Sequence, residues 1–229
     1  MQLTCINLQN LTSISKAHIR LLEAVIQLWR ETYTPILAAA KEQLSMDDFF
    51  SAKAALVLHE GDQPVGFCVL NSRPLGLSGV RDCRYFAPLP PKILEDLERT
   101  REALLSIEWV TVHPEHRAKL RKVQIADLVM GAAFRLFHQT SHTVVIGYSR
   151  TDVGADRIAM NFGVRGFEEI SLHGINCRVM IGRKEWVGAH RFTVVENAIE
   201  GLWQGRNIVG HGFLQGADLL FAEQVKHAA

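Results

Sequence analysis

The sequence has little cysteine, no long hydrophobic run and almost no net charge. Cys5, Cys68, Cys83 and Cys177 show no C-x-x-C spacing, which argues against a zinc site or a disulfide framework and favours the reduced thiols of a cytoplasmic protein. No stretch approaches eighteen consecutive apolar residues, and the amino terminus lacks a basic segment before an apolar run, so we expect neither a membrane span nor secretion. A net charge of +1 gives no overall attraction to nucleic acid.

The 229 residues do contain enough apolar side chains, 48% of the chain, for a substantial core. The most informative stretch covers residues 106–137, where a β-branched strand ends near Pro114 and a helix with apolar residues at helical spacing begins near Ile125. The loop between them is basic. Because a helix N-terminus presents unpaired N–H groups, this arrangement predicts a phosphate or pyrophosphate site. The basic side chains of the loop are Arg117, Lys119, Arg121 and Lys122.

The remaining patterns predict alternating strands and helices. We expect an edge strand over residues 3–8, a helix that Ser15 caps and Pro35 bends or ends, and a β-hairpin over residues 54–71 with Gly66 inside its second strand. A Gly/Pro-rich loop then leads into an amphipathic helix from Pro91 to Leu104. Strands are predicted at 143–149, 168–172 and 176–181, and two short amphipathic helices at 194–203 and 213–225.

Three stretches, in the expected order, resemble the GCN5-related N-acetyltransferase (GNAT) superfamily. The sequence VHPEHR at 112–117 is similar to the strand end and Pro-Arg loop of the family's central motif. The pair Val65-Gly66 resembles a pair in the family's preceding hairpin. The pair Gly166-Phe167 resembles the G-F pair near the end of the family pattern. The second half of the central motif departs from the family pattern. RKVQIA at 121–126 stands where R-x-x-G-x-A is usual, so Gln124 replaces the first glycine, and the loop is about four residues longer.

The resemblance implies an α/β fold with a GNAT-like mixed central sheet flanked by helices. The family pattern covers residues 1–186 as an acyltransferase domain. An inserted helix precedes its central strand, and residues 187–229 form a C-terminal helical extension packed on the domain. The extension would either cover the inserted helix and the acyl pocket or form the contact of a homodimer.

The resemblance also implies the activity and the donor: transfer of an acetyl or other acyl group from acetyl-CoA or another acyl-CoA to a primary amine, with no metal. The freed backbone of the central strand would bind the pantetheine arm and the thioester, and the loop with the start of the helix would bind the pyrophosphate. The matching positions are Val110, Thr111 and Val112 on the strand, and Arg117, Arg121, Lys122, Val123, Gln124, Ile125 and Ala126 beyond it.

For the catalytic groups, Glu108 stands where several members of the family carry a glutamate that acts as a base through water. The alternative is an ion pair between Glu108 and an arginine. The family's proton-donating tyrosine corresponds to Phe162, so that hydroxyl is absent. Tyr148 could replace it, or could anchor the sheet to a loop.

Three functions stay open from the sequence. The acceptor could be a small-molecule amine or an amino acid, acylated from a short acyl-CoA. The altered loop and apolar appendages favour instead a long-chain enzyme that resembles the N-acyl amino acid synthases and takes its acyl group from acyl carrier protein. Phe162 and Gln124 favour a third reading, a non-catalytic acyl-CoA-binding module.

Overall fold

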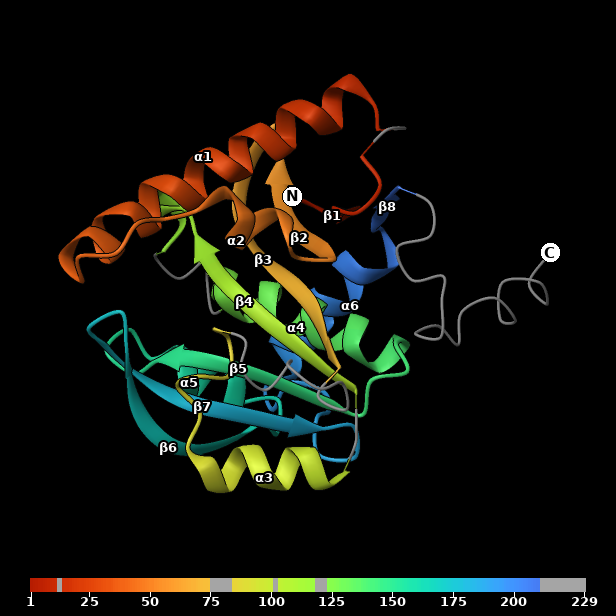
Figure 1. Ribbon diagram of the computed structural model, residues 1–229. Coiled ribbons are helices and arrows are strands. Elements are labelled where there is room, and N and C mark those ends of the chain that lie inside the picture. The colour runs from red at the N-terminus through yellow and green to blue at the C-terminus, as the bar shows by residue number, and fades with distance from the viewer. Residues whose placement is uncertain (12–13, 75–83, 101–102, 118–122, 211–229) are drawn as a thin grey trace.

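The computed structural model of the chain describes residues 1–11, 14–74, 84–100, 103–117 and 123–210 (Figure 1). These residues build one eight-stranded mixed sheet flanked by helices, so the predicted α/β class is confirmed. The strand order is β6-β7-β5-β4-β3-β2-β1-β8. The strands are β1 (Gln2–Asn7), β2 (Ala54–Glu60), β3 (Gln63–Pro74), β4 (Ala103–Val112), β5 (Val144–Arg150), β6 (Arg165–Leu172), β7 (Ile175–Arg183) and β8 (Asn207–Val209). The helices are α1 (Lys16–Ala39), α2 (Met46–Phe50), α3 (Pro91–Thr100), the 3-10 turn η1 (Pro114–His116), α4 (Ile125–Gln139), α5 (Ala155–Met160) and α6 (Thr193–Gln204).

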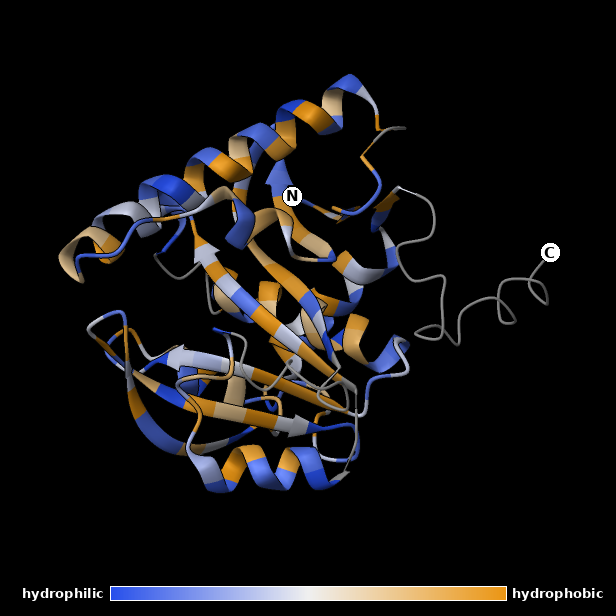
Figure 2. Ribbon diagram, viewed as in Figure 1, coloured by the Kyte–Doolittle hydropathy of each residue, from blue (hydrophilic) through white to orange (hydrophobic). Residues whose placement is uncertain are grey.

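Helices cover both faces of the sheet, and they divide one face into two halves. Helix α1 packs with α2 over β1 to β3, around Trp29 and Phe49. Helix α3 packs on the same face over β5 and β7, around Leu97 and Val179. Helices α4, α5 and α6 share the core on the opposite face. Figure 2 shows that α1 and α3 carry hydrophobic residues at intervals separated by hydrophilic ones, as expected for helices with one buried side.

The sheet is split between β4 and β5. These strands pair in parallel at only three positions, 104–106 with 144–146, and Figure 1 shows the two arrows diverging beyond that point. On its other side β4 stays paired with β3, but the register shifts between Phe67 and Val69. Trp109 lies in this bulge with a φ of 54°, a strained conformation for a residue with a side chain. The bulge and the lost pairing open a gap along the second half of β4.

The first C-terminal helix forms as predicted and packs on α4. A Cβ atom at Gly131 would lie 2.3 Å from the Cδ1 atom of Ile199, so the two helices approach closely because position 131 has no side chain. Arg135 of α4 forms ion pairs with Glu196 and Glu200 of α6. Helix α4 is therefore buried between the sheet and α6, while the inserted helix α3 lies on the other face.

Several local predictions need correction. β1 is not an edge strand, because β8 pairs with it in parallel, and the sequence pattern gave no sign of β8. Pro35 does not end α1, which continues to Ala39, because a proline removes one hydrogen bond while the turns on either side keep theirs. Leu104 was predicted to end the inserted helix but belongs to β4. Its side chain packs in the same hydrophobic cluster as those of α3. The helix predicted at 213–225 lies outside the described residues.

The turn after α5 gives a prediction for stability. Gly163 has a φ of 87°, and a Cβ atom there would lie 2.1 Å from the carbonyl oxygen of Trp186. Gly163→Ala should lower the free energy of unfolding by about 2–4 kcal/mol, because neither the backbone nor that carbonyl can move freely. In thermal unfolding this corresponds to a loss of about 5–10 °C. Gly188→Ala is the matched control, since nothing lies within 4 Å of its Cβ position; equal melting of the two variants would contradict the prediction.

Candidate functional site

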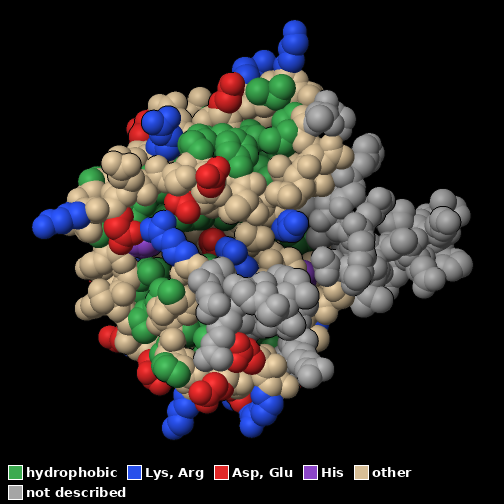
Figure 3. Space-filling view, viewed as in Figure 1, with side chains coloured by type: hydrophobic (Ala, Val, Ile, Leu, Met, Phe, Trp, Pro, Cys, Tyr) green, Lys and Arg blue, Asp and Glu red, His purple; other side chains and the backbone are tan. Residues whose placement is uncertain are grey.

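A cavity of about 730 Å³ occupies the gap between β4 and β5. Its walls come from both strands, from α1 and the segment 84–88 on one face of the sheet, and from the first turns of α4 and α5 on the other. Figure 3 shows acidic and basic side chains and a histidine together in the band between the α1 half and the α3 half of the visible face. The cavity therefore passes through the sheet where its ladder is interrupted.

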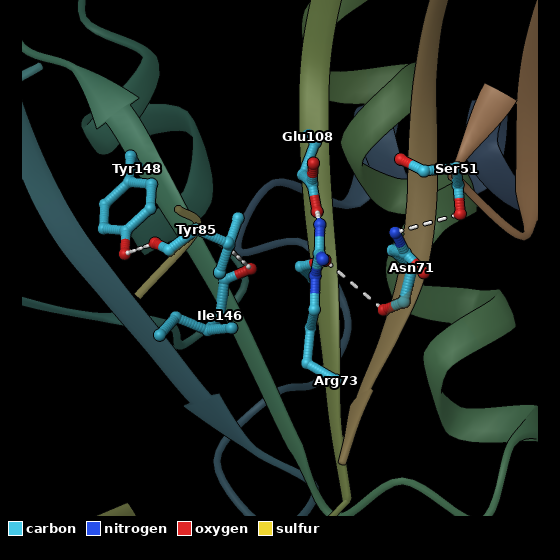
Figure 4. Close-up of polar contacts among 8 residues, drawn as sticks. Ser51, Asn71, Arg73, Tyr85, Glu108, Ile146 and Tyr148 are labelled. Atoms are coloured by element: carbon cyan, nitrogen blue, oxygen red, sulfur yellow. Dashed lines mark hydrogen bonds and ion pairs between the residues drawn. The ribbon is translucent and has the colours of Figure 1, made fainter. Parts of the chain in front are cut away.

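Glu108 lies in the wall of this cavity, in an ion pair. The Nη2 atom of Arg73, on β3, lies 2.6 Å from the Oε1 atom of Glu108, and the hydroxyl of Ser106 donates to the same oxygen. The Arg73 guanidinium also stacks 4.5 Å from the ring centre of Tyr85. Figure 4 shows Arg73 lying along β4 with its guanidinium turned toward Glu108. The ion-pair alternative is thus confirmed, and a catalytic role for Glu108 stays a prediction.

Tyr148 and Tyr85 hold the segment 84–88 against β5. The Tyr148 hydroxyl donates to the backbone carbonyl of Tyr85 at 2.6 Å, and the Tyr85 hydroxyl donates to the carbonyl of Ile146 at 3.4 Å (Figure 4). Burial raises the pKa of the Tyr85 phenol well above its ordinary value, and the Glu108 carboxylate adds to this. The structure places Tyr148 as an anchor between sheet and loop, as the second alternative predicted.

Tyr33 also reaches the gap, and the sequence reasoning did not select it. From α1 its hydroxyl donates to the carbonyl of Val110 at 3.1 Å, and its ring meets the edge of Trp109 with centroids 4.6 Å apart. Burial raises the pKa of the Tyr33 phenol, while the hydroxyl of Thr111 and the guanidinium groups of Arg150 and Arg117 act in the opposite direction. In the sequence, Tyr33 stands at helical spacing from the apolar residues of this helix, such as Trp29, which is the pattern of a core residue, so nothing in the sequence pointed to this role.

The part of β4 predicted to bind the donor lines the cavity, and its role in binding stays a prediction. Val110, Thr111 and Val112 all contribute to its wall. The Thr111 hydroxyl donates to the carbonyl of Trp109 at 2.9 Å and lies 3.4 Å from the Tyr33 oxygen. The Nε atom of Arg117 donates to the carbonyl of Val112 at 3.3 Å. With the bond from Tyr33 to Val110, side chains thus bond to three of the β4 carbonyls in the stretch that does not pair with β5.

The start of α4 lies at the same cavity. Gln124, Ile125 and Ala126 contribute to the wall, and helix geometry leaves the N–H groups of Ile125 and Ala126 without an acceptor inside the helix. Gln124 has a φ of −93°, an ordinary extended conformation, so this turn does not need the glycine that the family pattern has here. Val123 packs beside the core of α4. Arg121 and Lys122 lie outside the described residues.

Gly66 and Phe162 show what packs around the site. A Cβ atom at Gly66 would lie 2.9 Å from Ile125 and 3.1 Å from Val129, so α4 approaches the strand closely at this glycine. Phe162 is buried with its ring 5.0 Å from that of Phe134 and 4.8 Å from that of His190. This ring fills the core behind the cavity and brings no hydroxyl to it.

A second polar network closes the outer end of the gap. Glu42, just after α1, lies 2.5 Å from the Nη2 atom of Arg84 and 3.0 Å from the Nδ1 atom of His173 at the tip of the β6–β7 hairpin. The hydrogen bond from His173 lowers the pKa of the Glu42 carboxyl, and the charges of His173 and Arg84 act in the same direction. This clasp, formed by Glu42, Arg84 and His173, joins the two halves of the divided face.

Two further searches gave negative findings for the described part of the chain. No three or more His, Cys, Asp or Glu side chains are grouped so that they could hold a metal ion. No described helix has both the length and the apolar character needed to cross a membrane.

Comparison with known proteins gave matches only at the level of structure. No protein-family model and no curated protein sequence matches the chain. The chain is similar to BjaI, a CoA-dependent acyl-homoserine lactone synthase solved with SAM and isopentyl-CoA, at 13% identity over 91% of this chain and 93% of that one, with a TM-score of 0.57. It is similar to FeeM, an N-acyl amino acid synthase from uncultured soil microbes, at 8% identity over 80% and 91%, with a TM-score of 0.53.

A third similar structure is ElaA of Escherichia coli, at 12% identity over 79% of this chain and 99% of that one, with a TM-score of 0.50. At such low identities the likeness concerns the fold. The mixed sheet split between β4 and β5, with α4 behind the split, is the arrangement that the sequence motifs implied. The chain has the GNAT fold.

Proposed function

We propose that the chain is an acyl-CoA-dependent N-acyltransferase that moves an acyl group from a thioester to a primary amine by direct attack. The observation that carries the proposal is the cavity through the split between β4 and β5. A thioester on one side of the sheet and an amine on the other could meet there. The GNAT fold of the chain makes acyl transfer the reaction that this opening suits best.

The groups behind the sheet suit a CoA donor. The first N–H groups of α4 and the positive end of its dipole favour an anion at Ile125 and Ala126. Arg117 adds a cation at the same end of the cavity, as the phosphates of CoA require. The extended backbone of Val110 to Val112 offers polar groups to the amide-containing pantetheine arm.

The groups in front of the split suit the transfer itself. The amine nitrogen forms a bond to the thioester carbonyl carbon, the nitrogen loses a proton, and the C–S bond breaks with its electron pair on sulfur. Glu108, held in place by Arg73, takes the proton from the attacking nitrogen through a water molecule. Backbone N–H groups of the bulged part of β4 stabilise the oxygen of the tetrahedral intermediate.

Cys177 is the one described cysteine in the cavity wall, and its state favours direct attack. It is 4% exposed, and burial raises the pKa of its thiol to about 11. Since only the thiolate is nucleophilic, this thiol is a poor acceptor for an acyl group near neutral pH. The acyl group therefore passes to the amine without first being transferred to the protein.

The apolar part of the cavity favours a donor with an acyl chain longer than acetyl. Behind the sheet the wall is made of hydrophobic side chains from α4, from β5 and β7, and from the residue just before β6. These are Met130, Phe134, Val145, Val164 and Met180. Such a wall stabilises an alkyl chain by about 0.8 kcal/mol for each buried CH₂ group, which an acetyl group would hardly use.

Ligand-dependent stability tests the donor. The purified protein should unfold at a higher temperature with CoA, with acetyl-CoA and, most of all, with an acyl-CoA of four to eight carbons. A ligand at about a hundred times its Kd stabilises the native state by roughly 2.7 kcal/mol. Mass spectrometry of amine and amino acid mixtures incubated with the best donor should then show N-acylated products. No stabilisation by any CoA compound and no product would contradict the proposal; stabilisation without product would indicate a binding module.

Glu108→Gln tests the base. The variant should lower kcat about tenfold or more, because an amide cannot take a proton at this pH, while the thermal shift with acyl-CoA stays that of the wild type. Glu115→Gln is the matched control, as Glu115 is an exposed glutamate in η1 on the same segment. If the two variants turn over alike, Glu108 is not the base.

Cys177→Ala tests direct attack. The variant should keep its turnover within about threefold of the wild type, because a thiol with a pKa of about 11 is not needed as a nucleophile. Intact-mass spectra of the wild type mixed with acyl-CoA alone should show no acylated protein. An acyl group found on Cys177, with loss of turnover in the variant, would show that the reaction passes through the enzyme.

A further inference from the structure

All three tyrosines of the chain line the cavity, and each carries a weakly acidic hydroxyl. A departing alkyl thiolate has a conjugate acid with a pKa of about 8.5, by analogy with cysteine. A well-placed proton donor can therefore speed its release. The structure distinguishes the three hydroxyls by what each one contacts.

We propose that Tyr33 is the catalytic acid, giving its phenolic proton to the thiolate that leaves the donor. The inference rests on the proposed N-acyltransferase function. It moves the proton donor to α1, on the face of the sheet opposite to Phe162, and it replaces Tyr148 as the candidate for this role.

The position of Tyr33 carries the first part of the argument. Its hydroxyl donates a hydrogen bond to the carbonyl of Val110. Val110 belongs to the stretch of β4 that does not pair with β5. The C–S bond has to lie along this stretch if the donor passes through the split. Trp109, whose positive φ forms the bulge, packs its edge against the Tyr33 ring. The bulge that opens the sheet thus also fixes where this hydroxyl points.

The charges around Tyr33 carry the second part. Once the proton has left, a phenolate remains, and it is tolerated only where positive charge or hydrogen-bond donors face it. Burial raises the pKa of the Tyr33 phenol and keeps it protonated before the reaction, while the guanidinium groups of Arg150 and Arg117 act in the opposite direction and reduce the cost of the phenolate. The Thr111 hydroxyl lies 3.4 Å away and can turn from the Trp109 carbonyl to donate to the phenolate.

Tyr85 also has a guanidinium beside it, that of Arg73, but the other contacts of Tyr85 and Tyr148 differ from those of Tyr33. The Glu108 carboxylate opposes a phenolate on Tyr85, whose hydroxyl is bonded to Ile146 on β5. The Tyr148 proton is held on the Tyr85 carbonyl at 2.6 Å, where it fixes the segment 84–88. Releasing either proton would loosen a contact that closes the front of the cavity.

The step balances as a single proton transfer. As the C–S bond breaks, its electron pair goes to sulfur, and the O–H proton of Tyr33 forms the thiol. The proton taken from the amine leaves through Glu108 and water. The Tyr33 phenolate then takes a proton from water at the cavity mouth before the next turnover.

Tyr33→Phe tests the proposal, since it keeps the ring on Trp109 and removes only the hydroxyl. We would measure kcat and KM for butyryl-CoA with hydroxylamine as a small amine probe, in H₂O and in D₂O. We expect kcat to fall about 10²-fold while KM for butyryl-CoA stays within about threefold. The slowing of the wild type in D₂O should be smaller in the variant, because one of the two transferred protons, that of the Tyr33 hydroxyl, is no longer there.

Tyr148→Phe is the comparison variant, and thermal unfolding of both variants checks the fold. Any loss of rate in Tyr148→Phe should leave the slowing in D₂O unchanged, because the Tyr148 hydroxyl has a structural role. A Tyr33→Phe variant with kcat within threefold of the wild type, or with a reduced kcat and an unchanged D₂O effect, would overturn the proposal while leaving N-acyl transfer intact. A wild type that releases no CoA with any amine would instead overturn the proposed function.

Discussion

The early parting of β4 from β5 is the constraint on which the site depends. Backbone N–H and C=O groups inside a protein need partners, and β4 loses those of β5 after three paired positions. The structure replaces some of them with side chains, since Tyr33 donates to the carbonyl of Val110 and Arg117 to that of Val112. The strained bulge at Trp109 turns the strand so that these bonds can form. The opening is thus a built feature with its own hydrogen bonds.

A split sheet also needs something to hold its halves together. Behind the split, α4 packs on both halves and is itself covered by α6. In front, Tyr85 and Tyr148 bond the segment 84–88 to β5, and the clasp of Glu42, Arg84 and His173 joins α1 to the β6–β7 hairpin. Exposed ion pairs contribute little to stability. The rear contacts therefore fix the sheet more than the clasp does.

The sequence predicted what is local and missed what is formed between distant segments. The VHPEHR motif, Gly66 and the apolar spacing of α4 are each contained in one stretch, and each led to the right element. Tyr33 is separated from Val110 by 77 positions, and Glu42 from His173 by 131. No periodicity relates such pairs. β8 was missed for the same reason. It has only three residues, and these form a strand only because they pair with the free edge of β1.

The two departures from the family pattern that suggested a protein without turnover have physical substitutes in this chain. A glycine is needed in a turn when φ is positive, and Gln124 has an extended backbone, so the N–H groups at the start of α4 stay available to an anion. The hydroxyl missing at Phe162 is matched by that of Tyr33, which reaches the split from the opposite face. Neither departure therefore excludes the proposed acyl transfer, because an anion can still be held at the start of α4 and a hydroxyl still lies at the split.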